Sequence, residues 1–216
     1  MKNPKFRAII FDMDGVIVDS EPRHERAFRD IFEQIGYGQT HGIDFSSYYG
    51  RSDHALWLDF IAKHKPTHTI DELSGWKQRR FLEIIREEQP IFEDLPQLVH
   101  RLSLVYQLAL ASGSYHPTID AILALKDLRQ YFPVVVSVQD VANGKPAPDV
   151  FLRAAELLQV PPHECCVIED SAAGVEAARA AQMTVIAITN SLPAAKLSRA
   201  HHIVSSYKQI DDLLLG

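Results

Sequence analysis

The chain has 216 residues, of which 46% are hydrophobic and 23% are charged, and its 22 Lys and Arg against 28 Asp and Glu give a net charge of −6. This is a globular composition, and the length suits one large domain or one domain with an insertion. Mild acidity without a basic run argues against a nucleic acid or an anionic membrane as the main partner. No apolar run reaches the roughly 18 residues that a membrane-spanning helix needs.

The N-terminal segment and the cysteines indicate a compartment. The first apolar run is only a few residues long and ends in acids, without the apolar core and small-residue cleavage site of a signal peptide. The two cysteines, Cys165 and Cys166, are neighbours and provide no disulfide framework. We therefore expect a cytoplasmic protein, and we expect it to be a monomer.

Short apolar runs predict β-strands at Phe6–Phe11, Tyr106–Ala111, Val134–Val138, Cys165–Ile168, Thr184–Ile188 and His202–Val204. Apolar continuity over about five residues is typical of strands that are covered on both faces. Helical patterns follow or separate these runs at Leu95–Leu104, Pro117–Leu125, Pro148–Leu158, Ala172–Ala181 and Tyr207–Leu214. The alternation predicts an α/β fold, with a Rossmann-like parallel sheet, right-handed crossovers and helices on both faces.

About 75 residues between the first strand and the helix near Asp94 contain no good strand. Helical patterns occupy this stretch instead, at Pro22–Ile35, His54–His64 and Asp71–Glu88. They predict a small helical domain inserted in the first strand-to-helix connection. We assign residues 18–88 to this insertion and residues 1–17 and 89–216 to the α/β core.

Open parallel sheets bind ligands at the carboxyl ends of their strands. Asp12 and Asp14 follow the first strand two residues apart, so their side chains share a face of the extended backbone. Two carboxylates so close repel unless a cation or a shared proton relieves them. One can act as a nucleophile that forms an acyl-phosphate, with its neighbour as general acid and base. Taken alone, an Asp-rich turn that merely ends a strand is the more common alternative.

A second pair of acids, Glu169 and Asp170, directly follows the fourth predicted strand. Together with Asp12 they offer hard oxygen ligands, which suit Mg²⁺. The alternative is that Asp170 or Ser171 only caps the N-terminus of the helix Ala172–Ala181. Capping and metal binding are compatible, so both readings stay open.

Two further loops at strand ends offer groups that bind anions. Ser112 and Gly113 combine a hydroxyl with backbone N–H groups that can face an anion. Lys145, between Gly144 and Pro146, supplies an ammonium that would offset the acids and a phosphate. Each residue alone is more often an ordinary turn serine or a surface lysine.

In order and spacing, these motifs resemble those of the haloacid dehalogenase-like superfamily. The matching segments are Asp12–Glu21 (DMDGVIVDSE), Ser112, Lys145 and Glu169–Ser171. The resemblance covers nearly the whole chain, and it is to the branch that has a helical cap after the first strand. That branch includes β-phosphoglucomutase and small sugar-phosphate phosphatases.

The resemblance implies a role for each matching residue. Asp12 would attack phosphorus and become an aspartyl-phosphate, and Asp14 would be the general acid and base. Asp12, the carbonyl of Asp14, Glu169 and Asp170 would hold Mg²⁺, directly or through water. The phosphoryl oxygens would be held by Ser112, Gly113 and Lys145. Phosphoryl transfer depends mainly on such positioning and charge neutralisation.

The resemblance also suggests substrate-reading residues in the cap: His24, the loop residues Arg51 and Ser52, and Lys77. For each, the alternative is an ordinary surface or helix-face residue. One departure matters, because β-phosphoglucomutase has an Arg for the distal phosphate where this chain has Asp53. Arg51 at a neighbouring position would not reproduce the same geometry.

We therefore expect an Mg²⁺-dependent phosphatase that acts on a small phosphorylated metabolite, a sugar or polyol phosphate, with no nucleic acid or membrane partner. The alternative enzyme is a β-phosphoglucomutase-like phosphotransferase, in which a second sugar hydroxyl replaces water. A third possibility is a binding module that has lost catalysis. The intact acids Asp12, Asp14 and Asp170 and the intact Lys145 weigh against it, because a dead site has no need of a costly charge cluster.

Overall fold

A computed structural model of the chain describes residues 6–48 and 53–216. They form two compact units, which we call the core unit and the inserted unit. The core unit contains the residues up to Asp19 together with Ile91–Gly216, and the inserted unit is Ser20–Pro90. In the part of the chain that the structure describes, no helix combines the length and the apolarity that crossing a membrane requires.

The core unit is built on a six-stranded sheet with the order β3-β2-β1-β4-β5-β6, in which every pair of neighbours is parallel. The strands are β1 (Ala8–Phe11), β2 (Gln107–Ala111), β3 (Val134–Val136), β4 (Cys165–Glu169), β5 (Thr184–Ile188) and β6 (His202–Val204). The order reverses between β1 and β4, and such a reversal opens a crevice at the carboxyl edge of a parallel sheet. This edge is where the predicted site residues follow their strands.

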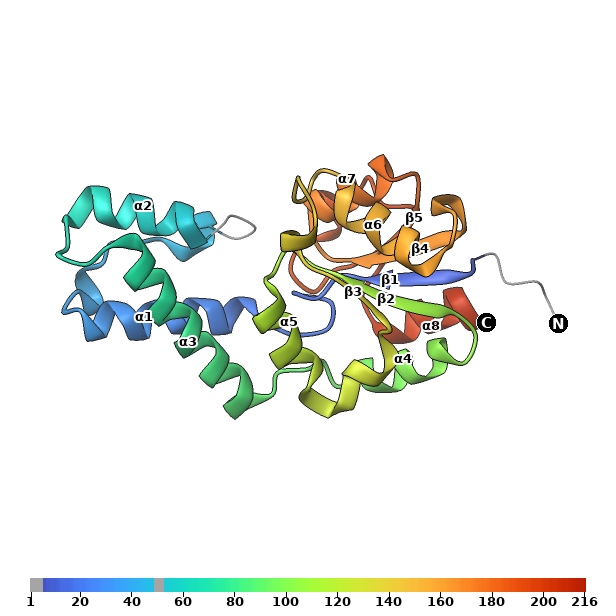
Figure 1. Ribbon diagram of the computed structural model, residues 1–216, viewed down its shortest axis with the longest axis horizontal. Helices are drawn as coiled ribbons and strands as arrows, with labels where there is room; N and C mark the ends of the chain where they lie inside the picture. Colours follow the sequence, from blue (N-terminus) through green and yellow to red (C-terminus); the bar gives the residue numbers. More distant parts are fainter. Residues whose placement is uncertain (1–5, 49–52) are drawn as a thin grey trace. The chain divides into compact units, whose positions relative to one another are not determined.

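Helices cover both faces of the sheet. Figure 1 shows α6 and α7 on one face and α4 and α8 on the other. The helices of the core unit are α4 (Leu95–Ser103), α5 (His116–Leu123), α6 (Asp149–Leu158), α7 (Ala172–Ala180) and α8 (Tyr207–Leu215). Apolar residues of α6 and α7 pack against side chains of β1, β2, β4 and β5 in one cluster. The double cover explains why the strands are continuously apolar.

Two predicted elements end two residues earlier than their patterns suggest. The strand predicted at Val134–Val138 ends at Val136, because Ser137 caps a short 3₁₀ turn at Val138–Asp140. The helix predicted at Pro117–Leu125 runs from His116 to Leu123 and is followed by a 3₁₀ segment, Leu125–Tyr131. A polar side chain that bonds its own backbone competes with strand and helix hydrogen bonds, which explains the first difference.

The inserted unit consists of α1 (Glu21–Gln34), α2 (Asp53–His64) and α3 (Ile70–Glu88), with 3₁₀ turns at Gly38–Thr40 and Phe45–Tyr48 (Figure 1). Its own core is aromatic: Trp57 packs against Phe28, Phe32 and Phe60 at ring-centroid distances of 5.0 to 6.0 Å. A capping box at Thr69 starts α3. The unit therefore has the hydrophobic cluster of a separate small domain.

The two chain segments that lead into and out of the inserted unit lie side by side in the core unit. Val18 and Ile91 form an antiparallel bridge, and the Phe92 N–H donates to the Ile17 carbonyl at 3.3 Å. This pairing holds residues 18 and 19 with the core, so the compact units divide two residues later than the boundaries assigned from the pattern.

Candidate active site

The loop after β1 places two carboxylates at the edge of the sheet. The Asp12 N–H still donates to the Ile168 carbonyl of β4, at 2.9 Å, and the chain then turns sharply. Gly15 adopts a φ of +72°, and a Cβ at this position would overlap the Asp170 carboxylate. Only glycine fits both the backbone conformation and the close approach. The turn therefore requires the glycine of the D-x-D-G motif.

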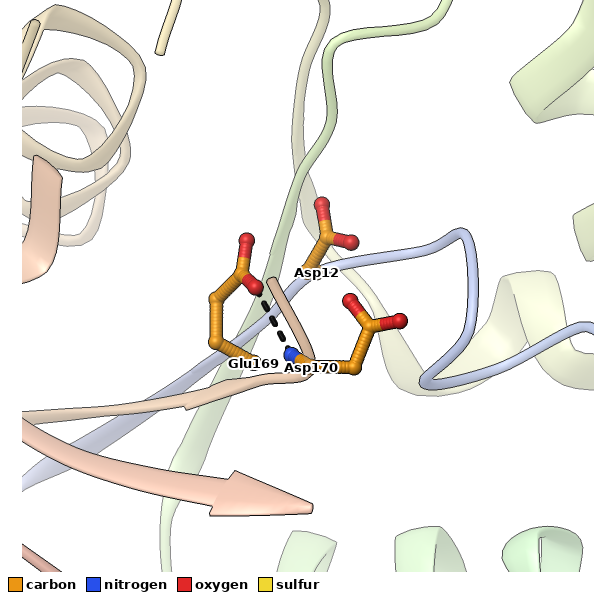
Figure 2. Close-up of side chains that lie close together, drawn as sticks. All are labelled: Asp12, Glu169 and Asp170. Atoms are coloured by element: carbon orange, nitrogen blue, oxygen red, sulfur yellow. Dashed lines mark hydrogen bonds between the residues drawn. The ribbon is translucent and has the colours of Figure 1, made fainter. Parts of the chain in front are cut away.

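Asp12, Glu169 and Asp170 form a buried acidic cluster, shown in Figure 2. Each contributes a carboxylate oxygen, and these oxygens all lie within 4.8 Å of one another. The three residues are exposed to 6%, 0% and 4%. Lys145 reaches the cluster and donates to Asp12 Oδ1 at 2.5 Å and to Glu169 Oε1 at 2.9 Å. Four predicted site residues from three loops thus meet at one place.

The charge of this cluster is unbalanced. Burial raises the pKa of Asp12 to about 7, the Lys145 ammonium opposes this, and Glu169 and Asp14 add to it. Burial and the neighbours Glu169 and Asp12 raise the pKa of Asp170 well above its ordinary value. Burial disfavours the Lys145 ammonium, but the attraction of Asp12 and Glu169 outweighs it and raises its pKa. Three carboxylates against one ammonium leave an excess of negative charge, and such a set of hard oxygen donors fits Mg²⁺.

Glu169 is held firmly at the start of α7. Its Oε2 accepts hydrogen bonds from the Asp170 N–H at 2.7 Å, the Ser171 N–H at 2.6 Å and the Ser171 hydroxyl at 2.9 Å. Ser171 also caps the helix by accepting from the Gly174 N–H. The helix N-terminus stabilises the carboxylate. Ser171 therefore caps the helix, while Glu169 and Asp170 belong to the acidic cluster, so the two roles predicted for this segment occur together.

Gly174 has a role that the sequence analysis missed. A Cβ at this position would overlap the Glu169 carboxylate, so the absence of a side chain leaves the space that Glu169 fills. The first turn of α7 therefore packs directly on the acid.

Asp14 lies beside the second predicted loop. Its Oδ2 accepts a hydrogen bond from the Ser114 hydroxyl at 2.9 Å, and its Oδ1 is buried with no hydrogen-bond partner among the described residues. Ser112 is fully buried, and its hydroxyl accepts from the Ser114 N–H at 3.0 Å. Gly113 between them is exposed, and a Cβ there would meet nothing within 4 Å. The loop leaves an open approach to its backbone next to Asp14.

Two residues of this edge were not predicted from the sequence: Ser114, which contacts Asp14, and Ser191, whose hydroxyl donates to Asp170 Oδ2. Ser191 follows β5. The sequence signal for Ser191 is its position just after the fifth predicted strand, because polar residues at strand ends gather at the same edge of a parallel sheet.

The predicted cap residues lie in the inserted unit. Lys77 is fully buried, donates to Asp53 Oδ2 at 2.6 Å and contacts His24 Nδ1. The His24 ring stacks on Phe81 with centroids 3.9 Å apart. These contacts join Lys77, His24 and Asp53 in one cluster within the unit. Arg51 and Ser52 lie outside the described residues.

Comparison with known proteins identifies the family. The chain is 37% identical over 204 residues to Protein SUPPRESSOR OF QUENCHING 1, chloroplastic, of Arabidopsis thaliana, which covers 91% of this chain but only 19% of that much longer protein. It is 30% identical over 188 residues to the fructose-1-phosphate phosphatase YqaB of Escherichia coli, covering 84% of this chain and 96% of the relative.

The fold is similar to that of solved structures. A crystal structure of a β-phosphoglucomutase from Clostridium difficile superposes with a TM-score of 0.77 at 25% identity, over 95% of this chain and 93% of the other. The sequence model of the haloacid dehalogenase-like hydrolases matches residues 6–182, which include all the carboxylates of the site and Lys145. The chain therefore belongs to the family of haloacid dehalogenase-like hydrolases.

Proposed function

We propose that the protein is an Mg²⁺-dependent phosphatase that hydrolyses a small phosphate monoester through an aspartyl-phosphate on Asp12. The observation that carries this proposal is the buried cluster of Asp12, Glu169 and Asp170, with the Lys145 ammonium on one oxygen of Asp12. A nucleophilic carboxylate, a cation that neutralises phosphoryl charge and a ligand set for a divalent ion are what phosphoryl transfer needs.

Asp12 carries out the first step. Lys145 occupies Asp12 Oδ1, so the other oxygen, Oδ2, attacks the phosphorus atom. A bond forms between this oxygen and phosphorus while the bond from phosphorus to the ester oxygen breaks. Mg²⁺ would be held by Asp12, Asp170, the Asp14 carbonyl and, directly or through water, Glu169. Its positive charge would offset the repulsion between the carboxylates and the phosphate.

Asp14 transfers the protons in both steps. Its carboxyl group gives a proton to the departing alkoxide, and the carboxylate then takes a proton from the water that attacks the aspartyl-phosphate. The Ser114 hydroxyl orients Asp14 by its bond to Oδ2. Ser112 and Gly113 bind the phosphoryl oxygens from the neighbouring loop. The products are an alcohol and inorganic phosphate, and Asp12 is regenerated.

We expect the substrate to be a sugar or polyol phosphate, because the E. coli relative is named a fructose-1-phosphate phosphatase. The inserted unit would act as a cap that excludes water and reads the substrate. His24, Arg51, Ser52 and Lys77 are the residues that we expect to do so. Lys77 contributes through a cluster in which Asp53 already balances its charge.

A phosphomutase activity is the second candidate, favoured by the similarity to β-phosphoglucomutase. Both enzymes would pass through the same aspartyl-phosphate. The Asp53 carboxylate argues for the phosphatase, since it lies where the mutase pattern has an Arg for a second phosphate, and it pairs with Lys77. A substrate with one phosphate places no second anion beside this acid.

The test is hydrolysis of p-nitrophenyl phosphate and a panel of sugar and polyol phosphates, with Mg²⁺ and with EDTA. We expect turnover only with Mg²⁺, and its loss in Asp12→Asn with the fold retained. Asp120→Asn, an equivalent change at an exposed carboxylate of α5, is the matched control and should keep full activity. Absence of Mg²⁺-dependent phosphate release from every ester would refute the proposal. Isomerisation of a hexose 1-phosphate without net phosphate release would favour the mutase.

A further inference from the structure

Two residues far from the D-x-D-G motif bind the backbone that follows it. The Asn190 side-chain amide donates to the Gly15 carbonyl at 2.8 Å and to the Tyr207 hydroxyl at 3.0 Å. The Tyr207 hydroxyl donates to the Val16 carbonyl at 2.8 Å. Asn190 follows β5, and Tyr207 is the first residue of α8. Two successive carbonyl groups of the loop after Asp14 are thus bound by side chains from the other half of the core unit.

Each hydrogen bond of Asn190 and Tyr207 has a fixed donor and a fixed acceptor. An amide NH₂ has two protons, and both are used, on Gly15 and on Tyr207. The phenol has one proton, which Val16 receives. Tyr207 is 7% exposed, and burial raises the pKa of its hydroxyl, so the group keeps this proton. Each donor has one acceptor, which makes the arrangement specific rather than interchangeable.

The loop depends on these outside partners. Within the loop, the N–H groups of Val16, Ile17 and Val18 all converge on the Met13 carbonyl, two of them at the long distance of 3.2 Å. No bond within this set uses the carbonyls of Gly15 and Val16. A buried carbonyl that loses its only donor destabilises its conformation. The carbonyl side of the Gly15–Val16 segment is therefore held by Asn190 and Tyr207, while the Gly15 N–H donates to the Val18 carbonyl at 2.9 Å.

The same short segment also reaches the acidic cluster. Ser191, next to Asn190, donates its hydroxyl to Asp170 Oδ2, and a Cβ on Gly15 would overlap both Ser191 Oγ and Asp170. Residues 190 and 191 thus fix the position of the Gly15 backbone relative to the Asp170 carboxylate.

We propose that Asn190 and Tyr207 are positioning residues that fix the Gly15–Val16 backbone and so aim the carboxyl group of Asp14 at the reacting oxygen. The inference rests on the proposed phosphatase function. Among the described residues, the Asp14 carboxylate accepts one hydrogen bond, from the Ser114 hydroxyl, so the direction of this side chain depends on the backbone that carries it. A displacement of about 1 Å in a catalytic group costs about 100-fold in rate.

The test compares Asn190→Ala and Tyr207→Phe with the control Tyr106→Phe. Tyr106 is also 7% exposed, and its hydroxyl also donates to a backbone carbonyl, that of Leu214 at 2.6 Å, but it precedes β2 at the amino edge of the sheet. The control therefore loses an equivalent hydrogen bond away from the site. Tyr207→Phe keeps the ring and its packing 5.8 Å from Phe92, so it retains the fold.

Two measurements are made on each full-length variant: kcat and KM for p-nitrophenyl phosphate, and amide hydrogen exchange of the peptide that covers residues 13–18 without Mg²⁺. For Asn190→Ala and Tyr207→Phe we expect kcat to fall by about 10- to 100-fold with KM within about twofold, and faster exchange in this peptide. Tyr106→Phe should change neither quantity.

Three results would overturn the inference: unchanged exchange of residues 13–18, faster exchange with unchanged kcat, or an equal loss of kcat in Tyr106→Phe. If the wild type hydrolyses no ester, the proposed function fails, and the exchange data alone then decide whether Asn190 and Tyr207 fix the loop. Unchanged exchange overturns the inference in that case too, and faster exchange confined to the two variants supports it.

Discussion

Asp12→Asn should make the metal-free protein more stable while it abolishes turnover. The substitution keeps the shape of the side chain and removes its charge from a cluster that already holds Glu169 and Asp170. A buried nucleophile that repels its neighbours is a source of instability in the absence of a cation. Asn190→Ala, by contrast, should lower kcat without making the metal-free protein more stable, so the two effects can be told apart.

The magnitude follows from the pKa of Asp12, which the fold raises from 3.8 to about 7. The folded protein therefore binds more protons than the unfolded chain between about pH 4 and pH 7, and stability falls as the pH rises through this range. Each pKa unit corresponds to about 1.4 kcal/mol, so ionised Asp12 lowers the free energy of unfolding by about 4 kcal/mol at pH 8. At pH 4.5 the ionisation of Asp12 lowers the free energy of unfolding by only about 1 kcal/mol.

The assay is urea denaturation of the wild type and Asp12→Asn in EDTA at pH 4.5 and pH 8, with Asp120→Asn as the control at an exposed site. The free energy of unfolding of Asp12→Asn should exceed that of the wild type by a small amount at pH 4.5 and by a several-fold larger amount at pH 8. Saturating Mg²⁺ should stabilise the wild type, by about 2.7 kcal/mol at 100 times Kd, and reduce the gap. A variant no more stable than the wild type at pH 8 in EDTA would refute the assignment of strain to this carboxylate.

Three further predictions follow from the described contacts. Ser114→Ala removes the hydrogen bond to the second aspartate of the motif and should lower kcat about tenfold in a phosphate-release assay, with little change in the melting temperature. Gly174→Ala forces a methyl group against Glu169 and should destabilise the protein by about 1–3 kcal/mol, measured by urea denaturation; an unchanged midpoint would contradict the packing. In the inserted unit, Asp53→Asn should destabilise more than Lys77→Met, because it leaves a buried ammonium without its carboxylate; thermal melts that rank them in the opposite order would contradict this.

The sheet could be predicted from the sequence because strands buried on both faces appear as uninterrupted apolar runs. Each of the predicted strands is present with its ends within two residues, and the parallel order confirms the fold class. The position of the site followed from the same pattern, since the polar residues after β1, β2 and β4 had to share an edge. Asp12, Lys145, Glu169 and Asp170 meet there as their order along the chain suggests.

The hydrogen-bond partners of the residues that support this site could not be predicted. The strand pattern places Ser114, Asn190 and Ser191 at the same edge of the sheet, but it does not say which group each of them binds. Ser114 binds a carboxylate 100 positions earlier, and Asn190 binds a carbonyl 175 positions earlier. Local patterns contain no information on such pairs, whose members meet only when the sheet is assembled. A monomeric state, a cytoplasmic location, the lack of a nucleic acid or membrane partner, and the roles of Arg51 and Ser52 stay predictions.

The bridge between Val18 and Ile91 has a consequence for how this protein can vary. For the core unit, residues 20–90 amount to one long loop whose ends are already joined. The entropy of closing a loop rises only slowly with its length, by about 0.6 kcal/mol for each doubling. A shorter, longer or different insertion should therefore change the free energy of unfolding of the core unit only a little. The loop that carries Asp12 and Asp14 keeps its backbone pairing through Val18 and Ile91. Under the proposed function, in which the inserted unit reads the substrate, a new substrate preference requires changes in that unit alone and leaves the site residues of the core unit in place.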